Sequence, residues 1–175
     1  MPFNAPQISR MTGIFSEAET LVGRYFRMSR EDVKANRYDV KTMVHLEKHE
    51  VDPGAFAHLC KYCCRKGQPA ASSDHFHFYR ICLQDDRILD AVDRAKSFIK
   101  FSPLVLYIAA HELVHIIRFN RGDSDFDAPL EEKRVEEEKV HHITQSVLQP
   151  VTGWDLGLVI DCFSSQYQIS DIFHG

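Results

Sequence analysis

The stretch Phe101–Asn120 reads FSPLVLYIAAHELVHIIRFN, and it decides how the rest of the chain is interpreted. It is among the most apolar stretches of the sequence, which is typical of a core helix. Ser102 followed by Pro103 predicts the start of this helix, with serine as the N-cap and proline in the first turn. We expect the helix to end near Phe119.

An H-E-x-x-H motif, His111-Glu112-Leu113-Val114-His115, lies inside this helix. Four residues make about one helical turn, so His111 and His115 project from the same face and can share one metal ion. Glu112 is placed to polarise a water molecule bound to that metal. Three ionisable groups on so apolar a helix are costly without a partner, which favours metal binding over a buried helix satisfied by hydrogen bonds alone.

A catalytic zinc needs a third protein ligand, and the next predicted helix, Pro129–Gln149, is rich in glutamate. At about 100° per residue, Glu136 and Glu137 fall within or beside the apolar face, whereas Glu138 lies nearly opposite. Glu137 shares a stripe with His141 and is the predicted third ligand, with Glu136 as the reserve. The inward face is marked by Val140, Ile143, Thr144, Val147 and Leu148.

A motif helix followed by a helix that donates a glutamate resembles the gluzincin branch of the zincin metallopeptidases. The second helix, EEKVHHIT at Glu137–Thr144 followed by VLQP at Val147–Pro150, also resembles the ImmA/IrrE-type metallopeptidases. The resemblance covers about residues 104–150, and it places the family's ligand glutamate on Glu137. Val140-His141 stands where that family has Ala-Asn.

The resemblance implies Zn²⁺ as the cofactor, His111, His115 and Glu137 as its ligands, and Glu112 as the catalytic general base. It implies a zincin-like helical domain that hydrolyses peptide bonds in a protein or peptide substrate. His141 would then orient a ligand from outside the metal's own shell. The elements expected along the chain make the fold mainly α (α+β), with a small strand component around His75–Leu83.

Bulk properties limit the other classes of function. At 175 residues, the chain is expected to form a single domain, 1–175, with a helical part, 1–70, and a metal-site part, 71–175. A net charge of −4 without a dense basic run argues against nucleic acid. There is no signal-like N-terminus, and Leu104–Ile117 is too short and polar to span a bilayer. We expect a cytoplasmic protein with no membrane partner; the oligomeric state stays open.

The remaining elements are expected from caps and periodicity. One strand is expected, His75–Leu83, preceded by a polar loop at Gly67–Asp74. Helices are expected at Ser16–Met28, from Ser29 towards Met43–Lys48, at Ala55–Cys64, Asp86–Ser97 and Trp154–Tyr167.

The cysteines offer a second candidate metal site. Five cysteines, three of them at Cys60, Cys63 and Cys64, do not resemble a disulfide framework. With His75 and His77, this cluster has the residue types of a structural zinc site, although buried, reduced cysteines are the simpler interpretation. The pair His45 and His49 also has i, i+4 spacing, but it lies on a highly charged face.

Two other functions remain open at this point. Glu112-x-x-His115 and Glu138-x-x-His141 both match the E-x-x-H pattern of di-iron carboxylate bundles, for which Glu17, Glu19 and Glu47 could complete the site. Alternatively, the zinc stabilises a non-catalytic interaction module. That module would tolerate Glu112→Gln, whereas a peptidase would keep its metal and lose turnover. A substrate pocket lined by Phe76, Phe78 and Tyr79 would suit an apolar side chain.

Overall fold

The computed structural model describes residues 1–65, 75–96, 98–151, 153 and 155–166. It is mainly helical, with 62% helix, 12% strand and one three-stranded mixed sheet, as expected for a mainly α protein with a strand component. The helices are α1 (Ala5–Tyr25), α2 (Arg30–Ala35), α3 (Asp85–Arg94), α4 (Phe101–Arg121), α5 (Leu130–Leu148) and α6 (Leu156–Gln166). The strands are β1 (Tyr38–Lys41), β2 (Ala57–Arg65) and β3 (His75–Leu83), and two 3-10 turns lie at Met43–His45 and Lys48–Glu50.

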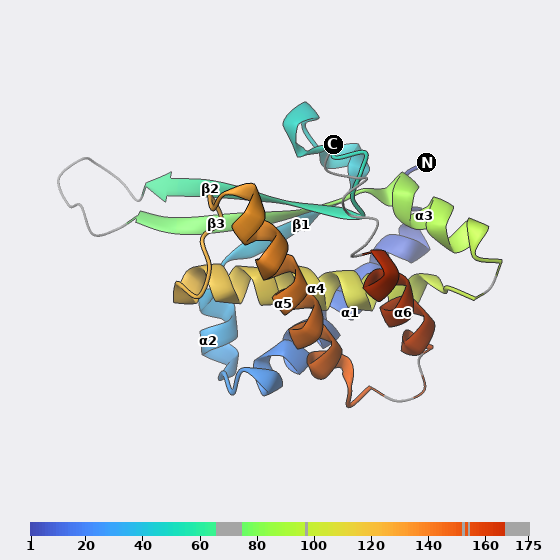
Figure 1. The fold of residues 1–175 in the computed structure, drawn as a ribbon. Helices are drawn as coiled ribbons and strands as arrows, with labels where there is room; N and C mark the ends of the chain where they lie inside the picture. The colour runs from blue at the N-terminus through green and yellow to red at the C-terminus, as the bar shows by residue number, and fades with distance from the viewer. Residues whose placement is uncertain (66–74, 97, 152, 154, 167–175) are drawn as a thin grey trace.

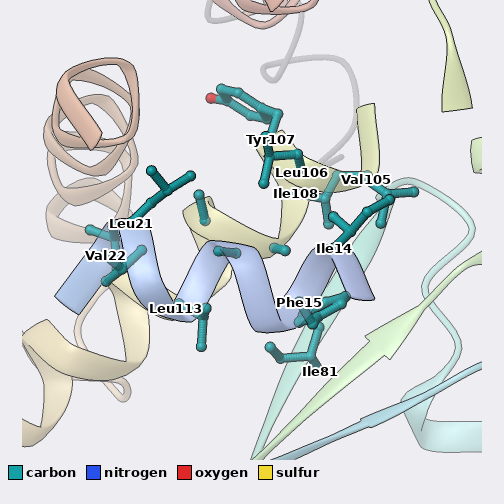
Figure 2. Packing of buried hydrophobic residues seen from close by; sticks show 14 of the residues in the cluster. Ile14, Phe15, Leu21, Val22, Ile81, Val105, Leu106, Tyr107, Ile108 and Leu113 are labelled. Carbon is teal, nitrogen blue, oxygen red and sulfur yellow. The ribbon is translucent and has the colours of Figure 1, made fainter. Parts of the chain in front are cut away.

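The core is built around α4, which runs through the middle of the molecule below the sheet in this view, with α5 and α6 in front of it (Figure 1). Its apolar residues contact α1 on one side, and Figure 2 shows Phe15 and Val22 of α1 in this packing, with Tyr107 of α4 pointing away from α1. Helices α3, α5 and α6 also contact α4. By length and composition α4 could cross a membrane, but 78% of its apolar window is buried within the protein, as in the core helix of a soluble protein.

The sheet has the strand order β1-β3-β2, with β1 parallel and β2 antiparallel to β3. The predicted strand His75–Leu83 is confirmed as β3. Side chains alternate between the two faces of a strand, and Tyr79, Ile81 and Leu83 are buried on the face that joins the helical core. Because β3 lies between the other two strands, β2 forms one edge of the sheet in the described structure.

The prediction of a helix at Ala55–Cys64 is wrong, because this segment forms β2. Its pairing with β3 along its whole length supplies backbone hydrogen bonds that local propensity cannot reveal. The helix capped by Ser29 exists, with Asp32 completing the capping box, but it ends at Ala35 rather than continuing to Lys48. The chain then enters β1, which pairs with β3 from the other side.

Two helix starts also differ from expectation. A capping box of Asn4 and Gln7 begins α1 at Ala5, so Ser16 lies inside the helix. The motif helix begins at Phe101, with Lys100 in the N-cap position, so Ser102 does not cap it. Gly122 ends this helix with a φ of +74°, a conformation that suits glycine. The other predicted helices correspond to α3, α5 and α6, whereas the loop Gly67–Asp74 lies outside the described residues.

Candidate metal centre

Helices α4 and α5 bring His111, His115 and Glu137 together. His111 Nε2 lies 3.1 Å from one carboxylate oxygen of Glu137, and His115 Nε2 lies 3.0 Å from the other. One ligand atom from each residue can be chosen so that all three lie within 4.8 Å of one another. A single carboxylate on α5 therefore faces both imidazoles of the motif.

The group lies at the boundary between core and solvent. His115 is buried, His111 is mostly buried, and the side chain of Glu137 is 48% exposed. Burial opposes ionisation of Glu137, but the charge of His115 and hydrogen bonds from both histidines hold its pKa well below the ordinary value. An ionised carboxylate and two imidazoles thus meet where a small molecule can approach from the solvent.

This donor set fits a metal ion. Two imidazole nitrogens and one carboxylate oxygen are the protein ligands of a known class of catalytic zinc sites, in which ligand atoms stand roughly 3.4 Å apart. The distances of 3.0 and 3.1 Å are close to that spacing. Both Nε2 atoms face the carboxylate, whereas neither buried Nδ1 atom has a hydrogen-bond partner among the described residues.

Glu112 is next to this group and is half-buried. Burial raises its pKa to about 7; the neighbouring charge of His111 lowers it, and that of Glu137 raises it. A carboxyl group with this pKa can both accept and release a proton near neutral pH.

The two glutamates that flank Glu137 on α5 do not join the group. Glu136 forms a two-pronged ion pair with the buried Arg118 of α4, whose Nη2 lies 3.1 Å from Oε2. Glu138 is exposed. Of these three glutamates, Glu137 is therefore the one that lies beside the two histidines. Sequence patterns did not reveal the Arg118–Glu136 pair, which engages the carboxylate of Glu136 elsewhere.

A layer of aromatic and imidazole rings lies next to the metal group, around Tyr107, one helical turn before His111 on α4. Tyr107 stacks on His111 with ring centroids 5.7 Å apart, and its hydroxyl hydrogen-bonds Nδ1 of His141. Nε2 of His141 lies 2.9 Å from the hydroxyl of Ser164 on α6. Burial, with the charges of His111 and His142, lowers the pKa of His141 to about 4. His141 thus orients Tyr107 through this hydrogen bond, and no sequence signal indicated Ser164.

A second ring layer lies on the other side, where Phe119 stacks on His115 with ring centroids 5.6 Å apart. Tyr79 and Phe126 pack against Phe119 in turn. The buried Tyr79 is therefore part of the core. Phe78 points to the opposite face of β3 from Tyr79, so these two residues of the predicted pocket do not line one surface, and the side chain of Phe76 lies outside the described structure.

The candidate cysteine site is not brought together by the described residues. Cys60 and Cys63 are three residues apart on β2, so their side chains point to opposite faces. Cys60 Sγ lies 4.0 Å from Cys82 Sγ, whereas Cys63 Sγ lies 3.6 Å from Nδ1 of His77. The helix expected at Ala55–Cys64 would have allowed a shared face, and the strand does not. The side chains of Cys64 and His75 lie outside the described structure.

The residues of the di-iron alternative are also dispersed. Glu138 is exposed, His141 bonds Tyr107 and Ser164, and Glu19 accepts a hydrogen bond from Tyr38.

The histidine pair at positions 45 and 49 is not part of the metal group that the described residues form. His49 pairs with Glu47 and with the hydroxyl of Tyr62.

Comparison of the chain with protein-family models, with curated proteins and with solved structures found no match. Its function is therefore inferred from the geometry of the site.

Proposed function

We propose that the protein is a zinc-dependent peptidase of the H-E-x-x-H type, with a zincin-like, gluzincin-like arrangement of its two site helices. The observation that carries this proposal is the carboxylate of Glu137, whose two oxygens face the Nε2 atoms of His111 and His115. Resemblance of the motif and of the glutamate helix to the zincins points the same way. The protein would act in the cytoplasm.

In this proposal His111, His115 and Glu137 hold the ion, and Glu112 is the catalytic residue. A bound zinc ion polarises a peptide carbonyl and makes a water molecule more acidic. Glu112 accepts a proton from the attacking water and returns it to the leaving nitrogen. Tyr107 and Phe119 stack on the two histidines and keep their rings in place.

The free edge of the sheet is a second reason to propose a peptide substrate. As an edge strand in contact with α4, β2 offers backbone donors and acceptors on its outer side, to which an extended peptide can add as a further strand. Gln84 N–H donates a hydrogen bond to Phe56 C=O, directly before β2. From this position, residues whose backbone groups bond to β3 alternate along β2 with residues whose backbone groups point outward. The backbone groups of Leu59, Lys61 and Cys63 therefore point away from β3.

Metal content tests the site. Protein purified without added metal is analysed by mass spectrometry, together with His115→Ala and Glu137→Ala. We expect one zinc per chain in the wild type and almost none in either variant. Glu138→Ala is the matched control, because it removes the adjacent, exposed carboxylate and should keep the metal. About two irons per chain would favour the di-iron alternative, and a metal-free wild type would contradict the proposal.

Glu112→Gln tests catalysis separately from binding. The variant should keep one zinc and lose peptide turnover by at least about 100-fold, since proton transfer by a positioned side chain contributes 10²–10⁴-fold. Unchanged metal content with no peptide turnover in the wild type would favour the non-catalytic, zinc-stabilised module.

A further inference from the structure

An apolar cavity of about 270 Å³ lies between α3, the first turns of α4 and α6. Its walls include Ala91 from α3, Leu104 from α4, and Val159 and Phe163 from α6. The charged residue among its described walls, Arg94, is ion-paired with Asp90 at 3.0 Å. The cavity therefore suits an uncharged, apolar group, and it is smaller than the pockets that enclose drug-sized ligands.

The cavity is connected to the metal centre by stacked rings. Phe163, which lines the cavity, stacks on Tyr107 with ring centroids 4.0 Å apart. Tyr107 stacks in turn on His111 at 5.7 Å. The ring of Phe163 thus lies no farther from His111 than these two distances combined, which an extended peptide spans with roughly three residues at 3.3 Å each.

The cavity also lies at one end of the edge strand. Phe56, the residue directly before β2, is part of its wall and packs edge-on against Phe163, with ring centroids 5.6 Å apart. A peptide added to the outer side of β2 would therefore reach the cavity at the beginning of that strand.

From this placement we infer that the cavity binds a large apolar side chain of the peptide substrate, two or three residues from the bond that is cleaved. The inference rests on the proposed peptidase function for the identity of the ligand. Binding of an apolar side chain in the cavity does not depend on cleavage, and it requires only that an extended peptide can lie along β2. Aromatic and branched aliphatic side chains match the apolar walls, whereas charged side chains would lose hydration without gaining a partner.

The test uses the zinc-loaded Glu112→Gln protein, so that peptides bind without being cleaved. The probes are octapeptides of glycine and alanine in which a single phenylalanine is moved from one position to the next, and Kd is measured by calorimetry. We expect one position at which phenylalanine binds at least about tenfold more tightly than alanine, as apolar pockets discriminate by 10–200-fold.

Filling the cavity should remove this preference. Ala91→Leu, made in the same background, extends a side chain into the cavity from α3 and should bring the phenylalanine-to-alanine ratio of Kd values close to one. Asp93→Leu is the matched control, because it adds the same side chain at an exposed position of α3 and should keep the preference. If Ala91→Leu does not fold, Cys162→Phe closes the cavity from α6.

The outcomes separate this inference from the proposed function. A positional preference that Ala91→Leu and Cys162→Phe abolish supports the apolar subsite, even if the wild type cleaves none of the peptides and the peptidase proposal fails. Equal Kd values along the whole series, or a preference that both filling variants retain, would overturn the subsite while leaving metal binding and turnover to their own tests.

Discussion

Contacts of Tyr107 with its neighbours fix the surroundings of the metal group. Its ring lies between His111 and Phe163, and its hydroxyl hydrogen-bonds the buried His141. Tyr107→Phe removes the hydroxyl and with it the hydrogen bond to His141, and we expect the free energy of unfolding to fall by about 1–3 kcal/mol. Urea denaturation measures the change, with the exposed Tyr25→Phe as the control. Equal effects of the two variants would contradict a structural role for this hydroxyl.

Glu50 is a fully buried acid on the other face of the sheet, away from the metal group. Burial alone would raise its pKa, but hydrogen bonds from Tyr62, the Glu47 backbone and Arg80 lower it from 4.5 to about 2. Because the pKa is lower in the folded protein, ionised Glu50 stabilises the fold above pH 4.5. This contribution should disappear as the pH falls from about 4.5 towards 2.

Urea unfolding at pH 5 and at pH 3 measures the contribution of Glu50. The wild type should lose more stability over this interval than Glu50→Gln, which lacks the titrating group. Glu17→Gln, a change at an exposed position of α1, should keep the wild-type dependence. The interpretation fails if Glu50→Gln and the wild type lose the same free energy of unfolding.

At the scale of elements, the ion pair between Arg118 and Glu136 sets how α5 lies on α4. The pair is largely buried, and it is one residue from Glu137, so it fixes the rotation of α5 that presents this carboxylate to the histidines. Arg118→Met should lower the free energy of unfolding by about 3–5 kcal/mol, the cost of removing one partner of a buried ion pair. It should also weaken zinc binding without abolishing it.

Zinc titration and urea unfolding measure both effects of Arg118→Met. Arg121→Met is the matched control at the end of the same helix. It removes an exposed contact with Phe26 and should cost less than about 1 kcal/mol. Complete loss of zinc from Arg118→Met at saturating metal, as expected for Glu137→Ala, would mean that Arg118 does more than orient α5.

For the whole molecule, the metal group should couple metal binding to stability, since its ligands join α4 and α5. Zinc at 1,000 times its Kd would add about 4 kcal/mol to the free energy of unfolding. A chelator should therefore lower the melting temperature by roughly 10 °C, given about 2–4 °C per kcal/mol for a chain of this size. The melting temperature of His115→Ala should not respond to the chelator, and an equal shift in both proteins would contradict the site.

Much of the helical part of the fold could be predicted from the sequence, because the signals are local. The apolar run of Phe101–Asn120, the cap at Ser29 and the period of α5 are set by residues within a few turns of one another. The same periodicity favoured Glu137 over Glu138, since a helix fixes which side chains share a face. The alternating aromatic residues of His75–Leu83 likewise indicated β3.

Only the tertiary structure decided the second long strand, the separation of the cysteines and the partner of Glu136. Ala57–Arg65 becomes a strand because β3 supplies its hydrogen-bond partners, and that change separates Cys60 from Cys63. Glu136 is engaged because Arg118, on another helix, lies opposite it. The physical reason is common to both: a residue's partner across an ion pair or a β-ladder lies far away in the chain, and local propensity contains no information about it.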